Sequence, residues 1–239
     1  MSKHTSFRIG GPAEAMLFPK TPDELAEILR KSALLDCKPV ILGAGTNVLA
    51  PDEGVRGIVI CLRDTFMGLT LLDDNRVEAM AGMTLAQTAM FAARNNLSGL
   101  EFAHGIPGTV GGGLYMNAGA YGGEMSQVVL SAKGINLCGN IVDIPLSEMQ
   151  LGYRTSIFKQ NGMVVTEITF KLEKGDTSAD VMMTAMGQGE TQMSPYHMAL
   201  IVSSIANGGT LMEPYLVGSV TNYTGTIISE TTPKKYKDL

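Results

Sequence analysis

The residues whose types and spacing point most clearly to chemistry lie between positions 99 and 123, where glycine recurs throughout the segment. Glycine tolerates positive φ and, because it has no Cβ, lets the backbone come close to a flat or charged ligand. Apolar residues such as Phe102, Ile106 and Leu114 alternate with these glycines, whereas a flexible linker is a Gly/Ser mixture without apolar anchors. We interpret this glycine-rich segment as a surface that faces a cofactor, and keep a linker as the less favoured alternative.

A second glycine cluster ends the apolar run at residues 39–49, PVILGAGTNVL. Such a run predicts a strand that enters a tight turn, whose backbone N–H groups can hold phosphate oxygens while Thr46 and Asn47 add side-chain donors. The dinucleotide-binding fingerprint does not fit, because Val48 stands where its third glycine would be and residues 50–54 interrupt the chain where a helix should begin. The pattern therefore predicts a phosphate site on a loop, with an ordinary strand and turn as an equal alternative.

A third motif, LGYRTSIFK at residues 151–159, comes just before an alternating apolar pattern at residues 163–172. Taken together, the motifs resemble one family, the UDP-N-acetylenolpyruvoylglucosamine reductases (UDP-N-acetylmuramate dehydrogenases) of bacterial cell-wall synthesis. The resemblance covers residues 1–174 of the 239-residue chain. In chain order the matching stretches are HTSFRIGGPA, LGAGTNVL, GLEFAHGIPGTVGGG, MNAGAYG and GYRTSIFK.

This resemblance implies an α+β fold, the two-lobed FAD-binding fold of the vanillyl-alcohol-oxidase type. It also implies FAD and NADPH as cofactors and a UDP-sugar as substrate, the enolpyruvyl ether of UDP-N-acetylglucosamine, which is reduced to UDP-N-acetylmuramate. Arg154 matches the family's arginine that polarises the substrate carboxylate, and a planar guanidinium suits a carboxylate. The alternative for Arg154 is a structural ion pair with a nearby acid.

Three groups of residues match positions that hold FAD in the family. The pyrophosphate turn is matched by Gly43, Ala44, Gly45, Thr46, Asn47 and Val48. The loop along the flavin and its phosphates is matched by Gly105, Ile106, Pro107, Gly108, Thr109, Gly111 and Gly112. The segment that passes near the flavin ring is matched by Asn117, Gly119 and Ala120.

A different resemblance starts after residue 174. Residues 180–239 resemble part of a penicillin-binding protein transpeptidase domain, on the stretches MGQGETQMSPYHMAL, IANGG and MEPY. The family's catalytic Ser-x-Asn and Lys-Thr-Gly motifs do not occur in the sequence, and the one Ser-x-x-Lys, from Ser156 to Lys159, lies inside the reductase motif. These absences argue against an acyltransferase.

The join between the two resemblances leaves the function open. The reductases' third domain, which closes over the UDP-sugar and carries the proton-donating serine and a glutamate, would begin near residue 175. No proton donor is assigned, because none of the following serines lies in the family's Gly-Ser-x-Phe context: Ser178, Ser194, Ser203 and Ser204. We therefore expect an impaired reductase, with a non-catalytic flavin-binding module or a chimeric product of two cell-wall genes as the alternative.

The composition of the chain excludes several classes of function. With 45% hydrophobic residues, 17% charged residues and a net charge of −5, the chain shows no basic footprint for nucleic acid. No signal peptide and no apolar run near the ~18 residues that span a bilayer are evident, so no membrane association is expected and a cytoplasmic location is predicted. The three cysteines are widely spaced and read as reduced thiols, with neither a disulfide framework nor a metal site.

The elements that must position these motifs follow from periodicity. We expect an FAD-binding lobe at residues 1–65, a second lobe at residues 66–174, and a helical or irregular tail at residues 175–239 that includes a helix at 195–207. Helices are predicted at residues 22–31, capped by Thr21, and at residues 84–95. Strands are predicted at residues 40–43, 57–62, 69–72, 76–81, 132–137, 140–145 and 163–172.

Overall fold

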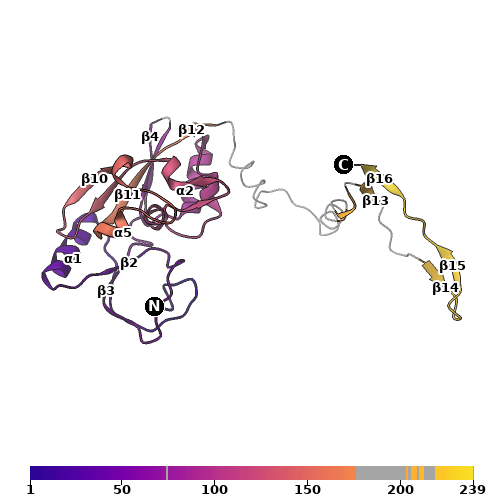
Figure 1. Ribbon diagram of the computed structural model, residues 1–239, viewed down its shortest axis with the longest axis horizontal. Coiled ribbons are helices and arrows are strands. Elements are labelled where there is room, and N and C mark those ends of the chain that lie inside the picture. The colour runs from indigo at the N-terminus through magenta and orange to yellow at the C-terminus, as the bar shows by residue number, and fades with distance from the viewer. Residues whose placement is uncertain (74, 176–202, 204–205, 209, 213–218, 239) are drawn as a thin grey trace. The chain divides into compact units, whose positions relative to one another are not determined.

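The computed structural model describes residues 1–73, 75–175, 203, 206–208, 210–212 and 219–238 (Figure 1). By their internal contacts the residues form two compact units, 1–182 and 183–239, and each is described by itself. The two glycine-rich motifs and the motif that contains Arg154 all lie in the first unit.

The N-terminal part of the first unit is a three-stranded parallel sheet with the strand order β1-β3-β2. Helix α1 (Pro22–Leu34) connects the first two strands, and the Thr21 side chain caps it by accepting a hydrogen bond from the Glu24 N–H at 3.2 Å. The predicted cap is confirmed, and the helix continues past residue 31 because no breaker follows. The strands are β1 (Ala13–Leu17), β2 (Val40–Leu42) and β3 (Val55–Cys61).

Strand β1 was not predicted from the sequence. Its five residues follow Gly-Pro without an alternating pattern, and they are extended because they pair in parallel with β3, about 40 positions further along the chain. The predicted strands at 40–43 and 57–62 correspond to β2 and β3.

The second part of the first unit is a five-stranded antiparallel sheet with the order β10-β9-β11-β5-β4. All five strands were predicted, with β9 beginning three residues earlier than expected. Strand β11 is central and pairs with both β9 and β5. The bounds are β4 (Leu69–Asp73), β5 (Arg76–Met80), β9 (Val129–Ile135), β10 (Ile141–Pro145) and β11 (Val164–Lys171).

Helices α2 (Leu85–Arg94) and α4 (Val110–Tyr115) pack against this sheet through a shared hydrophobic cluster. The start of α2 is fixed by a capping box between Thr84 and Gln87, which the sequence pattern had placed within the predicted helix. The glycine-rich segment also contains the short helix α3 (Glu101–His104), so this segment is partly helical. Smaller elements are β6 (Leu97–Ser98), β7 (Gly119–Ala120), β8 (Gly123–Glu124), η1 (Met125–Gln127), η2 (Leu146–Glu148), α5 (Phe158–Asn161) and β12 (Glu173–Lys174).

One hydrophobic cluster joins the two sheets. It combines side chains of α1, the residues that follow β3, and inward positions of the five-stranded sheet. Residues 1–65 and 66–174, expected as two lobes, therefore share this core. Its members are Leu25, Ala26, Leu29, Ile60, Leu62, Phe66, Ala81, Ile135 and Val164.

The described part of the second unit contains two antiparallel strand pairs, and its residues Ser203 and Ala206 are helical; the sequence had suggested a helical or irregular tail. Around the turn at residues 222–226, the Asn222 Oδ1 accepts hydrogen bonds from the N–H groups of Thr224 and Thr226. β-branched residues on both sides of this turn favour extended backbone. Most of the helix predicted at residues 195–207 lies outside the described residues. The pairs are β13 (Thr210–Met212) with β16 (Lys235–Asp238), and β14 (Ser219–Thr221) with β15 (Ile227–Glu230).

A matched pair of substitutions on α1 tests the shared core. Leu29 is 1% exposed, whereas Leu34 on the same helix is 85% exposed. We expect Leu29→Ala to lower the free energy of unfolding of the first unit by about 2–5 kcal/mol, because it leaves a cavity between the sheets. Leu34→Ala should change it by less than about 0.5 kcal/mol. Urea unfolding followed by circular dichroism measures both, and equal effects would contradict the assignment.

Candidate functional site

The structure brings the two glycine motifs into contact with each other. The Thr46 hydroxyl donates a hydrogen bond to the Pro107 carbonyl at 2.9 Å. Gly43 lies against Thr109, so closely that a Cβ on Gly43 would overlap the Thr109 hydroxyl. The turn at residues 43–48 and the loop at residues 105–109, which are about 60 positions apart in the sequence, therefore form one continuous surface.

Backbone N–H groups are unpaired on this surface. Within the part of the chain that the structure describes, none of the N–H groups of residues 43–48 donates a hydrogen bond. The same is true of the N–H groups of Gly108 and Thr109. A run of unpaired N–H groups forms a concave donor array that suits anionic oxygens, phosphate above all.

The conformation of this turn depends on Gly45 and on a segment that the sequence analysis did not assign to the site. Gly45 has φ +64°, and a Cβ there would overlap the His4 carbonyl oxygen and lie 2.9 Å from the Thr5 Cα. The Ser6 N–H donates a hydrogen bond to the Gly45 carbonyl at 3.0 Å. Residues 4–6 therefore pack against the turn from behind, so that glycine at 45 is required by the protein itself. No side-chain pattern at residues 4–6 indicated this, because the contacts use backbone atoms.

The glycines of the 105–113 stretch divide into two kinds. Gly111 and Gly113 pack inward, where a Cβ would lie 2.9 Å from the Ala81 Cβ and 3.1 Å from the Leu85 side chain. Gly105 and Gly112 are exposed, and a Cβ on Gly105 would meet no protein atom within 4 Å. Of the predicted residues, Gly105 and Gly112 are thus open to a ligand, while Gly111 packs inward and Ile106 packs against the hydrophobic core.

Asn117 belongs to the segment that was predicted to pass near a cofactor ring, and its side chain is buried and hydrogen-bonded within the protein. Its Nδ2 donates to the Gly152 carbonyl at 3.1 Å and its Oδ1 accepts from the Ser126 N–H at 3.0 Å. Hydrogen bonds from Ser126 and Asn117 also hold the pKa of Glu124 below its ordinary value. Asn117 therefore connects the segment at residues 117–120 to the arginine motif.

Arg154 lies at the tip of a tight turn, which we call the arginine turn, residues 152–155. Gly152 and Thr155 close it through two backbone hydrogen bonds of 3.2 Å each. Arg154 is exposed and has φ +54°, and its Nη2 donates to the Gly119 carbonyl at 3.3 Å. Among the described residues no carboxylate lies within ion-pair distance of its guanidinium. The charge of Arg154 is thus available to a ligand beside Gly119 and Ala120.

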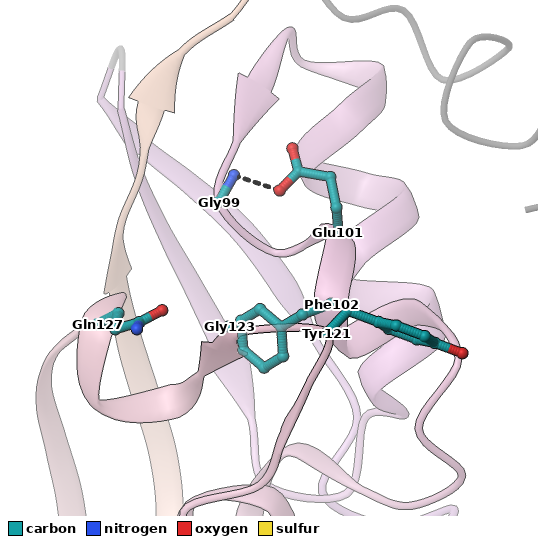
Figure 2. A pocket seen from close by; sticks show the side chains of 6 residues that line it. All are labelled: Gly99, Glu101, Phe102, Tyr121, Gly123 and Gln127. Atoms are coloured by element: carbon teal, nitrogen blue, oxygen red, sulfur yellow. Dashed lines mark hydrogen bonds between the residues drawn. The ribbon is translucent and has the colours of Figure 1, made fainter. Parts of the chain in front are cut away.

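A hollow of about 330 Å³ lies at the border of the glycine-rich segment (Figure 2). Two of its polar side chains already have partners, because Glu101 accepts from the Gly99 N–H at 2.8 Å and Gln127 accepts from the Glu124 N–H at 3.2 Å. None of the predicted site residues lines this hollow, and it is distinct from the surface at residues 43–48 and 105–109. Its lining residues are Gly99, Glu101, Phe102, Tyr121, Gly123 and Gln127.

Other classes of site find no support in the described residues. They contain no cluster of His, Cys, Asp and Glu suited to a metal ion, and none of their helices is both long and apolar enough to cross a membrane. The cysteines are unpaired: Cys37 is half-buried, Cys61 is buried and Cys138 is exposed. Burial raises the pKa of the Cys61 thiol.

Comparisons with known proteins address the family of the chain. Residues 13–144 match the FAD binding domain family, and residues 146–239 match the penicillin binding protein transpeptidase domain. The UDP-N-acetylenolpyruvoylglucosamine reductase of Clostridium tetani is 41% identical over 177 residues, which are 74% of this chain and 57% of that protein. The chain thus spans a little over half the length of this relative.

Solved structures extend the comparison to the fold. The UDP-N-acetylenolpyruvylglucosamine reductase from Thermus caldophilus superposes with a TM-score of 0.65 at 28% identity, covering 88% of this chain and 81% of that one. A chitooligosaccharide oxidase shares the fold with a TM-score of 0.57 at 18% identity, covering 72% of this chain and 39% of that one. The chain therefore belongs to the FAD binding domain family, has the two-lobed FAD-binding fold of the vanillyl-alcohol-oxidase type, and is related over its first three quarters to the UDP-N-acetylenolpyruvoylglucosamine reductases.

Proposed function

We propose that this chain binds FAD, with the pyrophosphate held by the N–H groups of residues 43–48 and of Gly108 and Thr109. The observation that carries the proposal is the run of unpaired backbone donors on a surface built from both glycine motifs. A diphosphate needs several donors and close backbone approach, and both are present there. The exposed glycines Gly105 and Gly112 leave room for the flat part of the cofactor beside this surface.

We further propose that the chain is an FAD-dependent reductase of peptidoglycan precursor synthesis, which uses NADPH to convert the enolpyruvyl ether of UDP-N-acetylglucosamine to UDP-N-acetylmuramate. Bound FAD would supply hydride transfer. Arg154 is then the catalytic residue that binds the substrate carboxylate and stabilises the charge that develops as the double bond is reduced. Its exposure and its position beside Gly119 support this role, as does the absence of an acidic partner among the described residues. A cytoplasmic location follows from a nucleotide-sugar substrate.

The second candidate is a flavin-binding module without reductase activity, in a chain whose last part derives from a transpeptidase. The observation that favours it is that no serine after residue 174 lies in the reductases' Gly-Ser-x-Phe context, so that the proton donor has no assigned residue. A missing general acid typically lowers the rate by about 10² to 10⁴. The two candidates share the cofactor and differ in turnover of the UDP-sugar.

A substitution at Gly105 tests FAD binding. Gly105→Ala adds a methyl group that meets no protein atom within 4 Å, and its φ of −80° suits alanine. We expect the fold to keep its melting temperature while the Kd for FAD, measured by quenching of flavin fluorescence, rises about tenfold. Gly45→Ala provides the contrast, because its clash with His4 should lower stability by about 2 kcal/mol or more whether or not FAD is present.

The proposal fails if the unmodified chain leaves flavin fluorescence unchanged at micromolar FAD. Unaltered affinity in Gly105→Ala would remove Gly105 from the cofactor surface.

Substitution of Arg154 separates the two candidate functions. In rapid mixing without oxygen, we expect Arg154→Ala to bind FAD and to be reduced by NADPH at the normal rate. Reoxidation by the enolpyruvyl UDP-sugar should slow about 10²- to 10³-fold, because the lost guanidinium acts on the substrate carboxylate alone. Arg154→Lys keeps the charge but not the planar fork, and should recover only part of the rate. A wild-type chain that NADPH reduces but the UDP-sugar does not reoxidise would favour the non-catalytic module.

A further inference from the structure

The arginine turn holds its central residue in an unfavourable conformation. Arg154 has φ +54°, a region that disfavours residues with a Cβ, and glycine or asparagine usually occupies such a position in a turn. Strain of this kind persists where neighbouring contacts impose it. The contacts around Arg154 therefore identify the residues that set its geometry.

Lys159 makes the most direct of these contacts. Its Nζ donates a hydrogen bond to the Arg154 carbonyl oxygen at 2.7 Å. The same ammonium lies 5.7 Å from the centre of the Tyr115 ring. Within the described part of the chain no carboxylate forms an ion pair with Lys159. The Lys159 ammonium therefore makes a charge-assisted hydrogen bond to the Arg154 carbonyl oxygen and lies close to the Tyr115 ring.

A second bond fixes the base of the turn to the same tyrosine. Ser156 is fully buried, and its hydroxyl donates to the Tyr115 carbonyl at 2.7 Å. Tyr115 is the last residue of α4, whose first turn is capped by Thr109, and Thr109 contacts Gly43. Helix α4 thus links the surface proposed for pyrophosphate to the arginine turn at a fixed separation.

We propose that Lys159 is a positioning residue, which holds Arg154 in its left-handed conformation and so presents the guanidinium to a carboxylate substrate. This inference rests on the role proposed above for Arg154. Without the Lys159 bond, the carbonyl of Arg154 is free to turn toward solvent and the turn relaxes to ordinary φ values. The guanidinium then leaves Gly119 and samples many positions, which weakens its action on the transition state more than the binding of FAD.

Three variants test the proposal. Lys159→Met keeps the length of the side chain but removes the donor, Lys159→Arg restores a cationic donor, and Lys38→Met removes an exposed lysine for which the described structure shows no side-chain bond. The first readout is tryptic cleavage after Arg154, followed by the mass of the fragment that ends there. We expect cleavage to be about fivefold faster in Lys159→Met, because the turn loses its charge-assisted bond, and unchanged in Lys38→Met.

The second readout separates positioning from mere stability. Reoxidation of the NADPH-reduced protein by the enolpyruvyl UDP-sugar should slow about tenfold in Lys159→Met and recover in Lys159→Arg. The Kd for FAD, the rate of reduction by NADPH and the melting temperature should not change in either variant. Equal cleavage and reoxidation rates in Lys159→Met and the wild type would overturn the proposal, as would matching losses in Lys38→Met.

The two proposals fail separately. If Arg154→Ala reoxidises at the wild-type rate, the role of Arg154 is wrong and the substrate-positioning role of Lys159 falls with it, whatever the cleavage rates. If Arg154→Ala is slow but Lys159→Met is as fast as the wild type, only the positioning inference is wrong.

Discussion

The site depends on one backbone constraint, the left-handed conformation of Gly45 against the N-terminal segment. The carbonyl of His4 occupies the place of a Cβ, and the Ser6 N–H binds the Gly45 carbonyl. The Gly45 carbonyl is thus bonded to the protein, whereas within the described part of the chain the N–H groups of residues 43–48 have no hydrogen-bond partner. A backbone N–H without a hydrogen-bond partner costs free energy unless water or a ligand accepts from it. A bound anion would satisfy several of these N–H groups at once. The rest of the first unit can be understood as support for this turn.

Helix α4 contacts the turn at residues 43–48, the five-stranded sheet region and the arginine turn. At its N-terminus Thr109 meets Gly43, and in its middle Gly111 and Gly113 allow close approach to Ala81 and Leu85. At its C-terminus the Tyr115 carbonyl receives the Ser156 hydroxyl. A single short helix therefore connects the three-stranded sheet, the five-stranded sheet and the arginine turn. Glycine in this helix serves packing at some positions and openness to a ligand at others, a distinction that depends on which neighbour faces each Cα.

Local signals predicted the elements well. The Thr21 cap, the helix that begins after Thr84 and all strands of the five-stranded sheet follow from patterns within a few residues. Features that depend on distant partners were missed, among them β1, whose extended form comes from pairing with β3, and the role of residues 4–6, whose contacts use only backbone atoms. The burial of Asn117 and its hydrogen bonds could not be predicted from its neighbours in the sequence either. Its partner Gly152 is far along the chain, and Ser126 comes close to it only because the chain folds back. Motif residues could be named from the sequence, but which of them pack inward, which hold other segments in place and which are exposed required the structure.

The fold of the first unit bears on where the first resemblance ends and the second begins. The match to the transpeptidase domain begins at residue 146, yet residues 146–174 are integral to the first unit. Strand β11 is the central strand of the five-stranded sheet, and its Ile168 and Phe170 are fully buried in the core beneath α2 and α4. Removing a central strand would expose both of its neighbours, so this stretch cannot belong to a separate domain. The arginine turn precedes β11 and is anchored to α4, which places it on the flavin side of the boundary. We infer that the transition between the two kinds of sequence falls after β12, beyond every residue proposed here to bind FAD or to act on the substrate.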